Sequence, residues 1–331
     1  MEREQIRSGV KDALQFLRRL EPGDDTQPLP PRLPDARIVN VEKRGEMFVR
    51  DVPGKEGAPT VVLLHGWTLS ADLNWFSGGY EVAARHGRVL AVDLRGHGRG
   101  LRSDQPFSLE AAADDVAALI RQLDAGPAVL VGYSMGGSIG MLAAERHPDL
   151  VAGLVLASCA LQWRSSLYER LVWLGMGLTE YVLRFGAPSG ITDRYLRHAV
   201  EQSPDLDGYE GWVKAEARRG DASDIGHAAK ALAKFDATEL VSRISCPAAV
   251  VVTVRDNLIR WRRQRDLAEA LDAHVVEVDG HHNAWLVMPD EWASAIDAAI
   301  QAVTASSPGA HGDPALRGDD RPLAEARAAH G

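Results

Sequence analysis

A series of continuous apolar segments limits what this chain can fold into more than any other feature of its sequence. None of the segments alternates between polar and apolar residues, so each strand must be covered on both faces, as in a parallel sheet. Helical patterns, among them 109–123 and 138–146, lie between the segments. This order predicts a doubly wound, mostly parallel α/β sheet. The segments are 60–64, 89–92, 128–131, 154–157 and 248–254, with two short strands before them at 38–41 and 47–49 and a further apolar stretch at 274–278.

One long interruption breaks the alternation of strands and helices. Residues 161–245 separate two of the apolar segments, whereas a normal crossover is far shorter. Their pattern is typical of several helices, and they contain tryptophans such as Trp163 and Trp212. We therefore expect a helical cap at 161–245, inserted into an α/β core made of 37–160 and 246–303.

The two ends of the chain differ from this body. Residues 4–20 place apolar side chains at helical spacing, and the prolines within 22–34 favour an extended connector. Residues 1–36 are therefore expected to form an amphipathic helix and its linker, with the helix packed on the main body or touching a membrane surface or a partner. Residues 304–331 have almost no large apolar side chains, which predicts a disordered tail.

Composition and charge exclude several classes of protein. The chain has 331 residues, 45% of them hydrophobic and 25% charged, so it can bury a large core. Its net charge of −9 argues against nucleic-acid binding, which needs a basic face. No apolar run reaches the roughly 18 residues of a membrane-spanning helix, and no secretory signal is recognisable, so we expect a cytoplasmic protein. Cys159 and Cys246 are too few for a disulfide framework and are interpreted as core residues.

The strongest chemical signal is the segment from Gly132 to Gly136, Gly-Tyr-Ser-Met-Gly, which matches G-x-S-x-G. An apolar strand precedes it and a helical pattern follows it, which is the context that this motif requires. A sharp strand-to-helix turn would present Ser134 as a nucleophile, with the free N–H groups of the helix start beside it. An ordinary structural turn is the alternative interpretation.

A second segment, Leu64 to Trp67, ends an earlier strand with the sequence Leu-His-Gly-Trp. Acyl transfer needs backbone N–H groups that face the serine and stabilise the oxyanion. We expect the N–H of Trp67 to supply one of them and the N–H of Met135 to supply the other. An ordinary glycine turn at the end of the strand is the alternative.

Two later loops carry an acid and a base. Asp256 follows the apolar segment that ends at 254, and His281 and His282 follow the stretch 274–278. A serine hydroxyl needs a base to take its proton, and the base needs an acid to set its tautomer. The serine, the aspartate and the histidines occur in the order Ser…Asp…His, which is that of the α/β-hydrolase triad.

Together these motifs resemble those of the α/β-hydrolase family, over roughly residues 37–303. Residues 92–98, Val-Asp-Leu-Arg-Gly-His-Gly, resemble the D-x-R-G-x-G loop of the family, in which Asp93 is expected to order its own loop. Residues 65–70, His-Gly-Trp-Thr-Leu-Ser, are similar to the H-G-(W/F)-P-L-S loop of the cofactor-free haloperoxidase-like esterases, with Thr68 in place of proline. The motifs specify the superfamily and say little about the substrate.

The resemblance also implies which histidine and which acid belong to the triad. Family members often place the histidine seven residues before a proline, so Pro289 selects His282 and leaves His281 in the place of the family's glycine. Some relatives carry the acid after the sixth strand. The corresponding segment here, 157–161, has no acid, so Asp256 is selected.

Metal and nucleotide chemistry are not indicated. His65, His281 and His282 form no metal-ligand motif, because adjacent histidines point apart on an extended chain and no H-E-x-x-H or cysteine pair completes a site. The glycine-rich turn lacks the lysine of a phosphate loop. Ser134 argues against haloalkane dehalogenases and epoxide hydrolases of this fold, which use an aspartate nucleophile. We therefore expect neither a metal nor a cofactor.

The sequence thus predicts a cofactor-free serine hydrolase that cleaves a carboxylic ester through an acyl-enzyme. The near balance of charge within 161–245 and the apolar residues of 167–185 predict a lipophilic small-molecule substrate. An acyltransferase, a perhydrolase and a C–C hydrolase on the same triad are alternatives, and a non-catalytic ligand-binding homologue is an alternative of another class. Weak contact with a membrane surface through the N-terminal helix or the cap is a further expectation, and the oligomeric state stays open.

Overall fold

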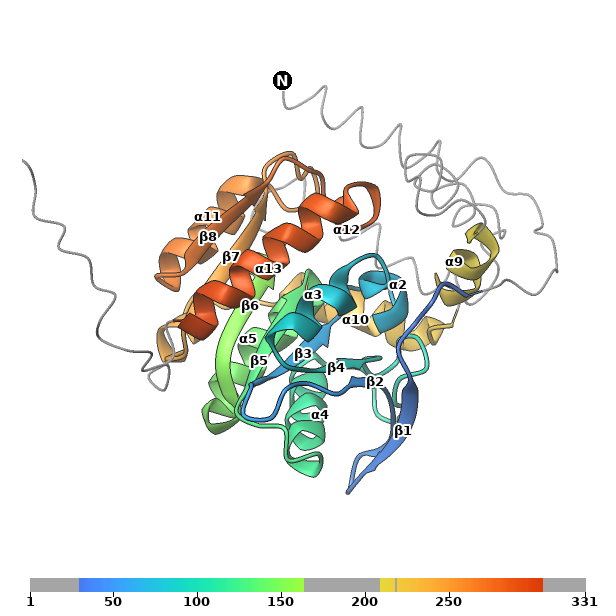
Figure 1. The fold of residues 1–331 in the computed structure, drawn as a ribbon. Coiled ribbons are helices and arrows are strands. Elements are labelled where there is room, and N and C mark those ends of the chain that lie inside the picture. Colours follow the sequence, from blue (N-terminus) through green and yellow to red (C-terminus); the bar gives the residue numbers. More distant parts are fainter. Residues whose placement is uncertain (1–29, 164–208, 218, 306–331) are drawn as a thin grey trace, which may run out of the picture.

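The computed structural model describes residues 30–163, 209–217 and 219–305, and its centre is an eight-stranded sheet (Figure 1). The strand order is β1-β2-β4-β3-β5-β6-β7-β8. β2 pairs antiparallel with β1 and β4, and the other neighbouring strands pair parallel. The prediction of a doubly wound, mostly parallel α/β sheet is therefore confirmed. The strands are β1 (Ala36–Val41), β2 (Gly45–Val52), β3 (Thr60–Leu64), β4 (Arg88–Val92), β5 (Ala128–Tyr133), β6 (Val151–Ala157), β7 (Ala248–Thr253) and β8 (His274–Val278).

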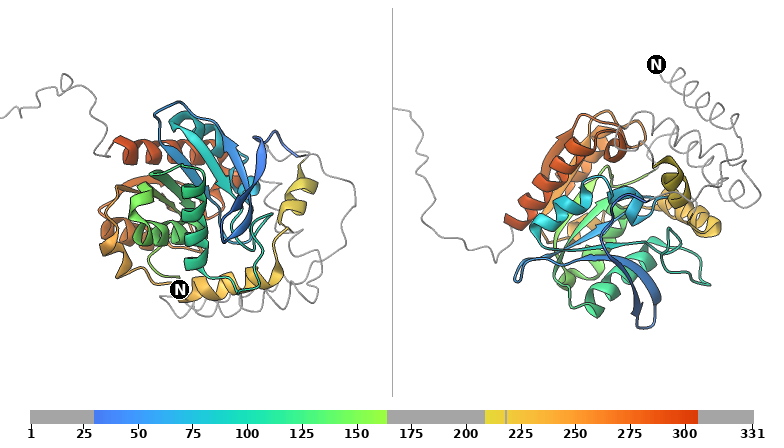
Figure 2. Two further views of the ribbon diagram at one scale, coloured as in Figure 1. Left: turned by 90° about the horizontal axis from the view of Figure 1, so that it is seen from below. Right: turned by 45° about the vertical axis from the view of Figure 1, so that its right-hand side comes forward.

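Helices cover both faces of the sheet (Figure 2). On β3, Val62 belongs to one buried cluster and Val61 to the other, because successive side chains of a strand point to opposite faces. Two covered faces explain why the central strands are continuously apolar. The first cluster includes residues of α4 (Leu109–Gln122), α5 (Met135–Arg146) and α11 (Trp261–Ala270), and the second those of α2 (Ala71–Trp75), α3 (Gly79–His86), α12 (Ala284–Val287) and α13 (Pro289–Ala305).

Helix α5 begins at Met135, before the start at 138 that the helical pattern predicts. Gly136 and Gly137 are poor helix formers, so the local pattern hides the first turn. Packing requires them nevertheless, since a Cβ at Gly137 would lie 2.9 Å from the Sγ of Cys159. Tertiary contacts therefore override the low helix propensity of glycine at the N-terminus of α5, which adjoins Ser134.

The segment predicted as a cap contains α9 (Glu210–Ala217), α10 (Ala222–Lys234) and the 3₁₀ helix η3 (Leu240–Arg243). α9 contacts α2, α10 contacts α4, and η3 contacts α5. An isolated bridge between Gln162 and Asp236 ties the two ends of the segment together. Another 3₁₀ helix, η1 (Pro148–Leu150), leads into β6. The division of the chain into core and cap stays a prediction.

Several predictions from the sequence fall outside the described residues. These are the helix within 4–20, the apolar segment 167–185 and almost all of the tail at 304–331. Residues 30–35, at the end of the proline-rich connector, have no regular secondary structure. In the part of the chain that the structure describes, no helix combines the length and the apolar character needed to cross a membrane.

Candidate active site

Ser134 lies in the turn between β5 and α5 with backbone angles of φ 53° and ψ −114°. Residues other than glycine rarely adopt a positive φ, and such strain persists only where the surroundings enforce it. The N–H of Ser134 donates to the carbonyl of Ala157 at 2.8 Å, and its carbonyl accepts the N–H of Gly137 at 2.9 Å. The turn therefore fixes the serine at the carboxyl end of β5.

Two glycines make this turn sterically possible. A Cβ at Gly132 would lie 2.4 Å from the carbonyl oxygen of Gly136, and a Cβ at Gly136 would lie 2.2 Å from the carbonyl oxygen of Leu64. Side chains at these positions would push β3, β5 and α5 apart. The glycine spacing of the motif thus has a steric cause in this chain.

The loops after β7 and β8 bring Asp256 and His282 to the edge of the sheet that carries Ser134. His282 Nε2 lies 3.1 Å from Ser134 Oγ, and His282 Nδ1 lies 2.7 Å from Asp256 Oδ2. An ionised carboxylate only accepts hydrogen bonds, so the proton of the neutral ring is on Nδ1, and Nε2 accepts the serine hydroxyl. The three residues predicted to form the triad are therefore in hydrogen-bond contact.

The adjacent histidines have different surroundings. His281 is exposed, whereas His282 is half-buried against the ring of Tyr133, with 5.3 Å between the ring centroids. The hydroxyl of Tyr133 also donates to the carbonyl of His282 at 2.6 Å. Tyr133 precedes the serine in the chain, so it ties the histidine loop to the turn that carries Ser134.

The loop after β3 carries Trp67, one of the two residues predicted to bind the oxyanion. Asn74 of α2 accepts the N–H of Gly66 at 3.0 Å, and the indole N–H of Trp67 donates to the carbonyl of Ile225 on α10 at 2.9 Å. Thr68 has a φ of 65°, which is unusual for a β-branched residue. The path of this loop is therefore set jointly by α2 and by the predicted cap.

Met135, the other predicted oxyanion residue, is the first residue of α5. The first N–H groups of a helix have no acceptor within the helix and lie at its positive end. The close approach of Gly136 to the carbonyls of Leu64 and His65 shows that the start of α5 lies against the end of β3. The structure thus brings the two predicted oxyanion segments next to each other.

His65 links two loops rather than facing the serine. Its Nδ1 donates to the carbonyl of Gly66 at 2.8 Å, and its Nε2 accepts the N–H of Leu94, after β4, at 3.0 Å. This pattern requires the neutral ring, and complete burial lowers the pKa of His65 to about 4. His65 therefore stabilises the loop that carries Trp67.

Buried carboxylates surround Arg99 in the loop after β4. Its guanidinium contacts Asp93 at 3.0 Å, Asp72 at 2.9 Å and Glu216 at 3.0 Å. Asp93 also accepts the backbone N–H groups of Arg99 and Ala71, each at 2.7 Å, and burial raises the pKa of Asp93. Asp93 thus orders the loop of its own motif, and Glu216 of α9 joins the predicted cap to the core.

The sequence motifs do not include the side chains that hold the acid. Thr253, at the end of β7, and Gln264, on α11, lie 3.0 Å and 3.2 Å from Asp256 Oδ2. For Gln264, the helical spacing of α11 carries a signal. Gln264 shares the buried face of α11 with Leu267 and Ala268, at the spacing i, i+3, i+4. A polar side chain on such an apolar face needs a buried hydrogen-bond partner.

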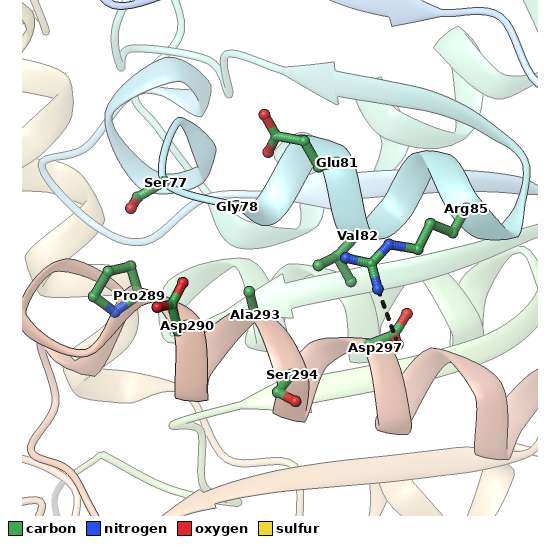
Figure 3. Close-up of a pocket in the computed structure, with 10 residues that line it drawn as sticks. All are labelled: Ser77, Gly78, Glu81, Val82, Arg85, Pro289, Asp290, Ala293, Ser294 and Asp297. Carbon is green, nitrogen blue, oxygen red and sulfur yellow. Dashed lines mark hydrogen bonds and ion pairs between the residues drawn. The ribbon is translucent and has the colours of Figure 1, made fainter. Parts of the chain in front are cut away.

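A groove of about 390 Å³ lies between α3 and α13, away from this site (Figure 3). Glu81 and Arg85 line it from α3, and Asp290 and Asp297 line it from α13. Arg85 and Asp297 approach each other across the groove at 3.5 Å. Its lining includes no residue of the predicted triad. Over the residues with described positions, no three metal-ligating side chains are grouped to hold a metal ion.

A mostly parallel sheet with a serine at a strained strand-to-helix turn, and an acid and a histidine after its last two strands, defines an α/β-hydrolase. The chain belongs to the alpha/beta hydrolase fold family, whose model matches residues 59–289. The resemblance drawn from the sequence motifs is therefore confirmed.

Individual relatives include esterases and a haloperoxidase. A pimeloyl-(acyl-carrier protein) methyl ester esterase of Neisseria meningitidis is 35% identical over 199 residues, which are 59% of this chain and 75% of that protein. A non-heme chloroperoxidase of Streptomyces lividans is 41% identical over 116 residues, 34% of this chain and 40% of that protein. The structure of a thermophilic esterase from Thermogutta terrifontis superposes with a TM-score of 0.64 at 23% identity, covering 81% of this chain and 99% of that one, and so shares the fold.

Proposed function

We propose that this protein is a cofactor-free serine hydrolase of carboxylic esters, with Ser134 as the nucleophile, His282 as the base and Asp256 as the acid of the triad. The observation that carries the proposal is the continuous contact from Ser134 Oγ through His282 to Asp256, at 3.1 Å and 2.7 Å. The prediction of an ester hydrolase is confirmed at the level of the class by the esterase relatives. The roles of the individual residues rest on the geometry.

In the first step, Ser134 Oγ attacks the carbonyl carbon of the ester. The hydroxyl proton moves to His282 Nε2, and the positive imidazolium that forms is stabilised by Asp256 across the 2.7 Å contact. The proton on Nδ1 stays in place during this transfer. His282 Nε2 then gives the transferred proton to the departing alcohol oxygen, which leaves an acyl group on Ser134.

The negative oxygen of the tetrahedral intermediate needs fixed donors. The backbone N–H groups of Trp67 and Met135 are proposed for this role, since their two segments adjoin at the end of β3. The positive end of α5 adds to the stabilisation. Water, deprotonated by His282 Nε2, then attacks the acyl carbon and releases the acid, and the proton returns to Ser134 Oγ.

Of the other reactions that this triad supports, perhydrolysis is the one that a feature of the structure disfavours. Acyl transfer, perhydrolysis and C–C bond cleavage differ in the acceptor or the leaving group, which the pocket selects and the triad does not. The loop similar to that of the haloperoxidase-like esterases has Thr68 at φ 65°, and proline, with φ fixed near −65°, cannot adopt that backbone. A non-catalytic ligand-binding role is disfavoured by the intact contact between Ser134 and His282.

The proposed substrate is a small-molecule ester with an apolar acyl or alcohol group. The esterase relatives support carboxylic esters as the general class. The apolar preference rests on the composition of 161–245, whose acidic and basic residues nearly balance. A cytoplasmic location and weak contact with a membrane surface stay predictions from the sequence.

Labelling with a fluorophosphonate tests the nucleophile. Wild type is expected to react at one site, and Ser134→Ala is expected to remain unlabelled while hydrolysis falls by at least about 10⁴-fold. Alanine has no bulkier side chain than serine, so the variant keeps the fold, which circular dichroism checks. Activity near wild type in the alanine variant would remove Ser134 from the mechanism.

A chain-length series of p-nitrophenyl esters tests the substrate class. Each buried methylene contributes at most about 0.8 kcal/mol, or roughly fourfold in kcat/KM. We expect kcat/KM to rise from acetate to medium-chain esters. A preference for acetate with a steep fall by hexanoate would contradict the apolar pocket and leave the triad unaffected.

A further inference from the structure

The two carboxylate oxygens of Asp256 have different partners. Oδ1 accepts the backbone N–H groups of Leu258 and Ile259, both at 2.8 Å, which anchors the side chain to its own loop. Oδ2 faces His282 Nδ1 at 2.7 Å and also lies 3.0 Å from Thr253 Oγ1 and 3.2 Å from the amide nitrogen of Gln264. The oxygen that touches the histidine is therefore held by side chains from two further elements, β7 and α11.

The amide of Gln264 has only one orientation that satisfies its surroundings. Its oxygen accepts the backbone N–H of Thr253 at 3.0 Å, and its nitrogen donates to the carbonyl of Ile259 at 2.7 Å. A flip of the amide would place a donor against the N–H of Thr253 and an acceptor against a carbonyl. The nitrogen is consequently fixed toward Asp256 Oδ2 and Thr253 Oγ1, which it approaches at 3.0 Å.

The hydrogen bonds of Gln264 extend beyond the backbone groups beside it. Gln264 is fully buried, and the backbone groups of Thr253 and Ile259 would by themselves satisfy one donor and one acceptor of its amide. Its second amide N–H is left for the polar cluster around the acid. Thr253 Oγ1 extends this cluster to the hydroxyl of Ser158 at 3.1 Å. Ser158 directly follows Ala157 of β6, whose carbonyl accepts the N–H of Ser134.

Other charged side chains near the acid are engaged elsewhere. Arg255 pairs with Asp279, and Arg263 donates to the carbonyl of Gln162. Among the described residues, His282 is the titratable side chain that hydrogen-bonds to Asp256. A neutral donor, and not a salt bridge, thus accompanies the acid, which leaves the full charge of the carboxylate available to His282.

We propose that Gln264 is a positioning residue for the reaction: its amide, with the hydroxyl of Thr253, holds Asp256 Oδ2 in line with His282 Nδ1–H. Gln264 is fully buried and hydrogen-bonds to Thr253, Ile259 and Asp256, so its proposed effect on the reaction passes through Asp256. Without it, the carboxylate rotates about its Oδ1 anchor, the imidazolium formed in the transition state loses its aligned partner, and proton transfer slows. The inference rests on the proposed function, since it requires His282 to act as the base.

Kinetics of Gln264→Met test the inference, because methionine has a similar length and no donor. We expect kcat to fall about 10- to 100-fold with KM within twofold of wild type, the usual effect of losing a buried hydrogen bond to a charged group. Gln162→Met is the matched control, since Gln162 donates at 2.8 Å to Asp236, a carboxylate whose hydrogen bonds are to Gln162 and Thr238 and not to the triad. Its kcat is expected to match wild type.

A double-mutant cycle separates positioning from a general loss of structure. If Gln264 acts through Asp256, then Asp256→Asn with Gln264→Met is as slow as Asp256→Asn alone. Multiplication of the two losses would overturn the inference. The low-field proton resonance of His282 Nδ1–H, measured by NMR, is expected to shift in Gln264→Met and to persist in Gln162→Met; an unchanged resonance with slowed kcat would also overturn it.

The same cycle distinguishes failure of this inference from failure of the proposed function. Full activity in Asp256→Asn would remove the triad itself, whatever the effect of Gln264. Gln264→Asn, which keeps an amide on a shorter side chain, provides a second variant if methionine prevents folding. A shorter amide cannot reach both Thr253 and Asp256, so we expect a partial loss of kcat, and unchanged kcat in a folded Gln264→Asn protein would contradict the role assigned to the amide.

Discussion

At the residue scale, two of the strained backbone positions among the described residues belong to the segments proposed to carry the chemistry. Ser134 and Thr68 both have positive φ values, 53° and 65°, and neither is a glycine. Such conformations cost of order 1–3 kcal/mol each and persist only when neighbouring contacts enforce them. At Ser134 the contacts are the hydrogen bond to Ala157 and the closely packed glycines on either side. The surrounding sheet therefore supplies the energy that keeps the serine in place.

The two adjacent histidines provide a matched pair for testing the base. His282→Ala is expected to abolish turnover and to suppress fluorophosphonate labelling, because Ser134 loses the acceptor at 3.1 Å. His281→Ala is the control and should retain most activity, since its side chain is exposed. Rates of labelling and hydrolysis measure both effects. Reversed phenotypes would show that the base has been assigned one residue too late.

At the scale of elements, helix α9 is joined to the core by a buried charge. Glu216 accepts the hydroxyl of Ser70 at 2.9 Å and the guanidinium of Arg219 at 2.7 Å, in addition to its contact with Arg99. Ser70 caps α2 and ends the loop that carries Trp67, so Glu216 connects the predicted cap to the predicted oxyanion segment. A buried carboxylate is tolerated here because cationic and hydroxyl donors surround it.

Glu216→Gln tests this connection, since the amide keeps the shape and removes the charge. We expect the free energy of unfolding to fall by about 1–3 kcal/mol, because Arg99 loses one of its buried anionic partners. Glu239→Gln, an exposed position in the same segment, is the control and should stay within about 0.5 kcal/mol of wild type. Urea unfolding measures both variants. Equal stability of Glu216→Gln and wild type would show that the network does not hold α9.

At the scale of the whole molecule, buried histidines make stability depend on pH. Burial lowers the pKa of His65 to about 4 and that of His97 to about 3, against an ordinary value of 6.5. As the pH falls below 6.5, these histidines therefore bind protons in the unfolded chain but not in the folded protein. Their contribution to stability is fully present above pH 6.5 and is lost progressively toward pH 4 for His65 and pH 3 for His97.

The expected slope is up to about 1.4 kcal/mol per pH unit for each histidine, or roughly 2 kcal/mol each between pH 6.5 and 5. Asp93, whose pKa is raised by burial, acts in the opposite direction. Asp51, whose pKa is lowered by its hydrogen bond to Arg88, loses its contribution only below its ordinary value of 3.8. Urea unfolding at pH 7.5 and pH 5.0 measures the difference.

His97→Phe isolates one contribution, because it removes the titration and keeps a ring against Phe107. The fall in unfolding free energy between pH 7.5 and 5.0 is expected to be smaller in this variant than in wild type. An identical fall in both proteins would show that His97 takes up its proton equally in the folded and unfolded states. His97→Gln serves the same purpose if the larger ring does not fit.

The sequence by itself determined the strands, the fold class and the positions of the proposed catalytic residues. The segments of β3 to β7 are local, and burial on both faces leaves continuous apolar runs that need no partner to be recognised. Ser134, Asp256 and His282 were identifiable because each follows a predicted strand, and the carboxyl ends of parallel strands share one edge of a sheet. Their catalytic roles stay proposals, but their proximity follows from this topology.

The tertiary structure alone decided which residues support that site. The start of α5 at Met135, the amide of Gln264 beside Asp256 and the reach of Glu216 to Arg99 all depend on partners distant in the chain. The sequence around a glutamine or a glutamate is the same whether or not the fold places a hydrogen-bond partner beside it. Glycine lowers helix propensity even where close packing requires it. Helical spacing can mark a side chain such as Gln264 as buried, but it does not show which distant group that side chain contacts. Only the folded sheet, which sets the distance between those segments, determines these hydrogen bonds.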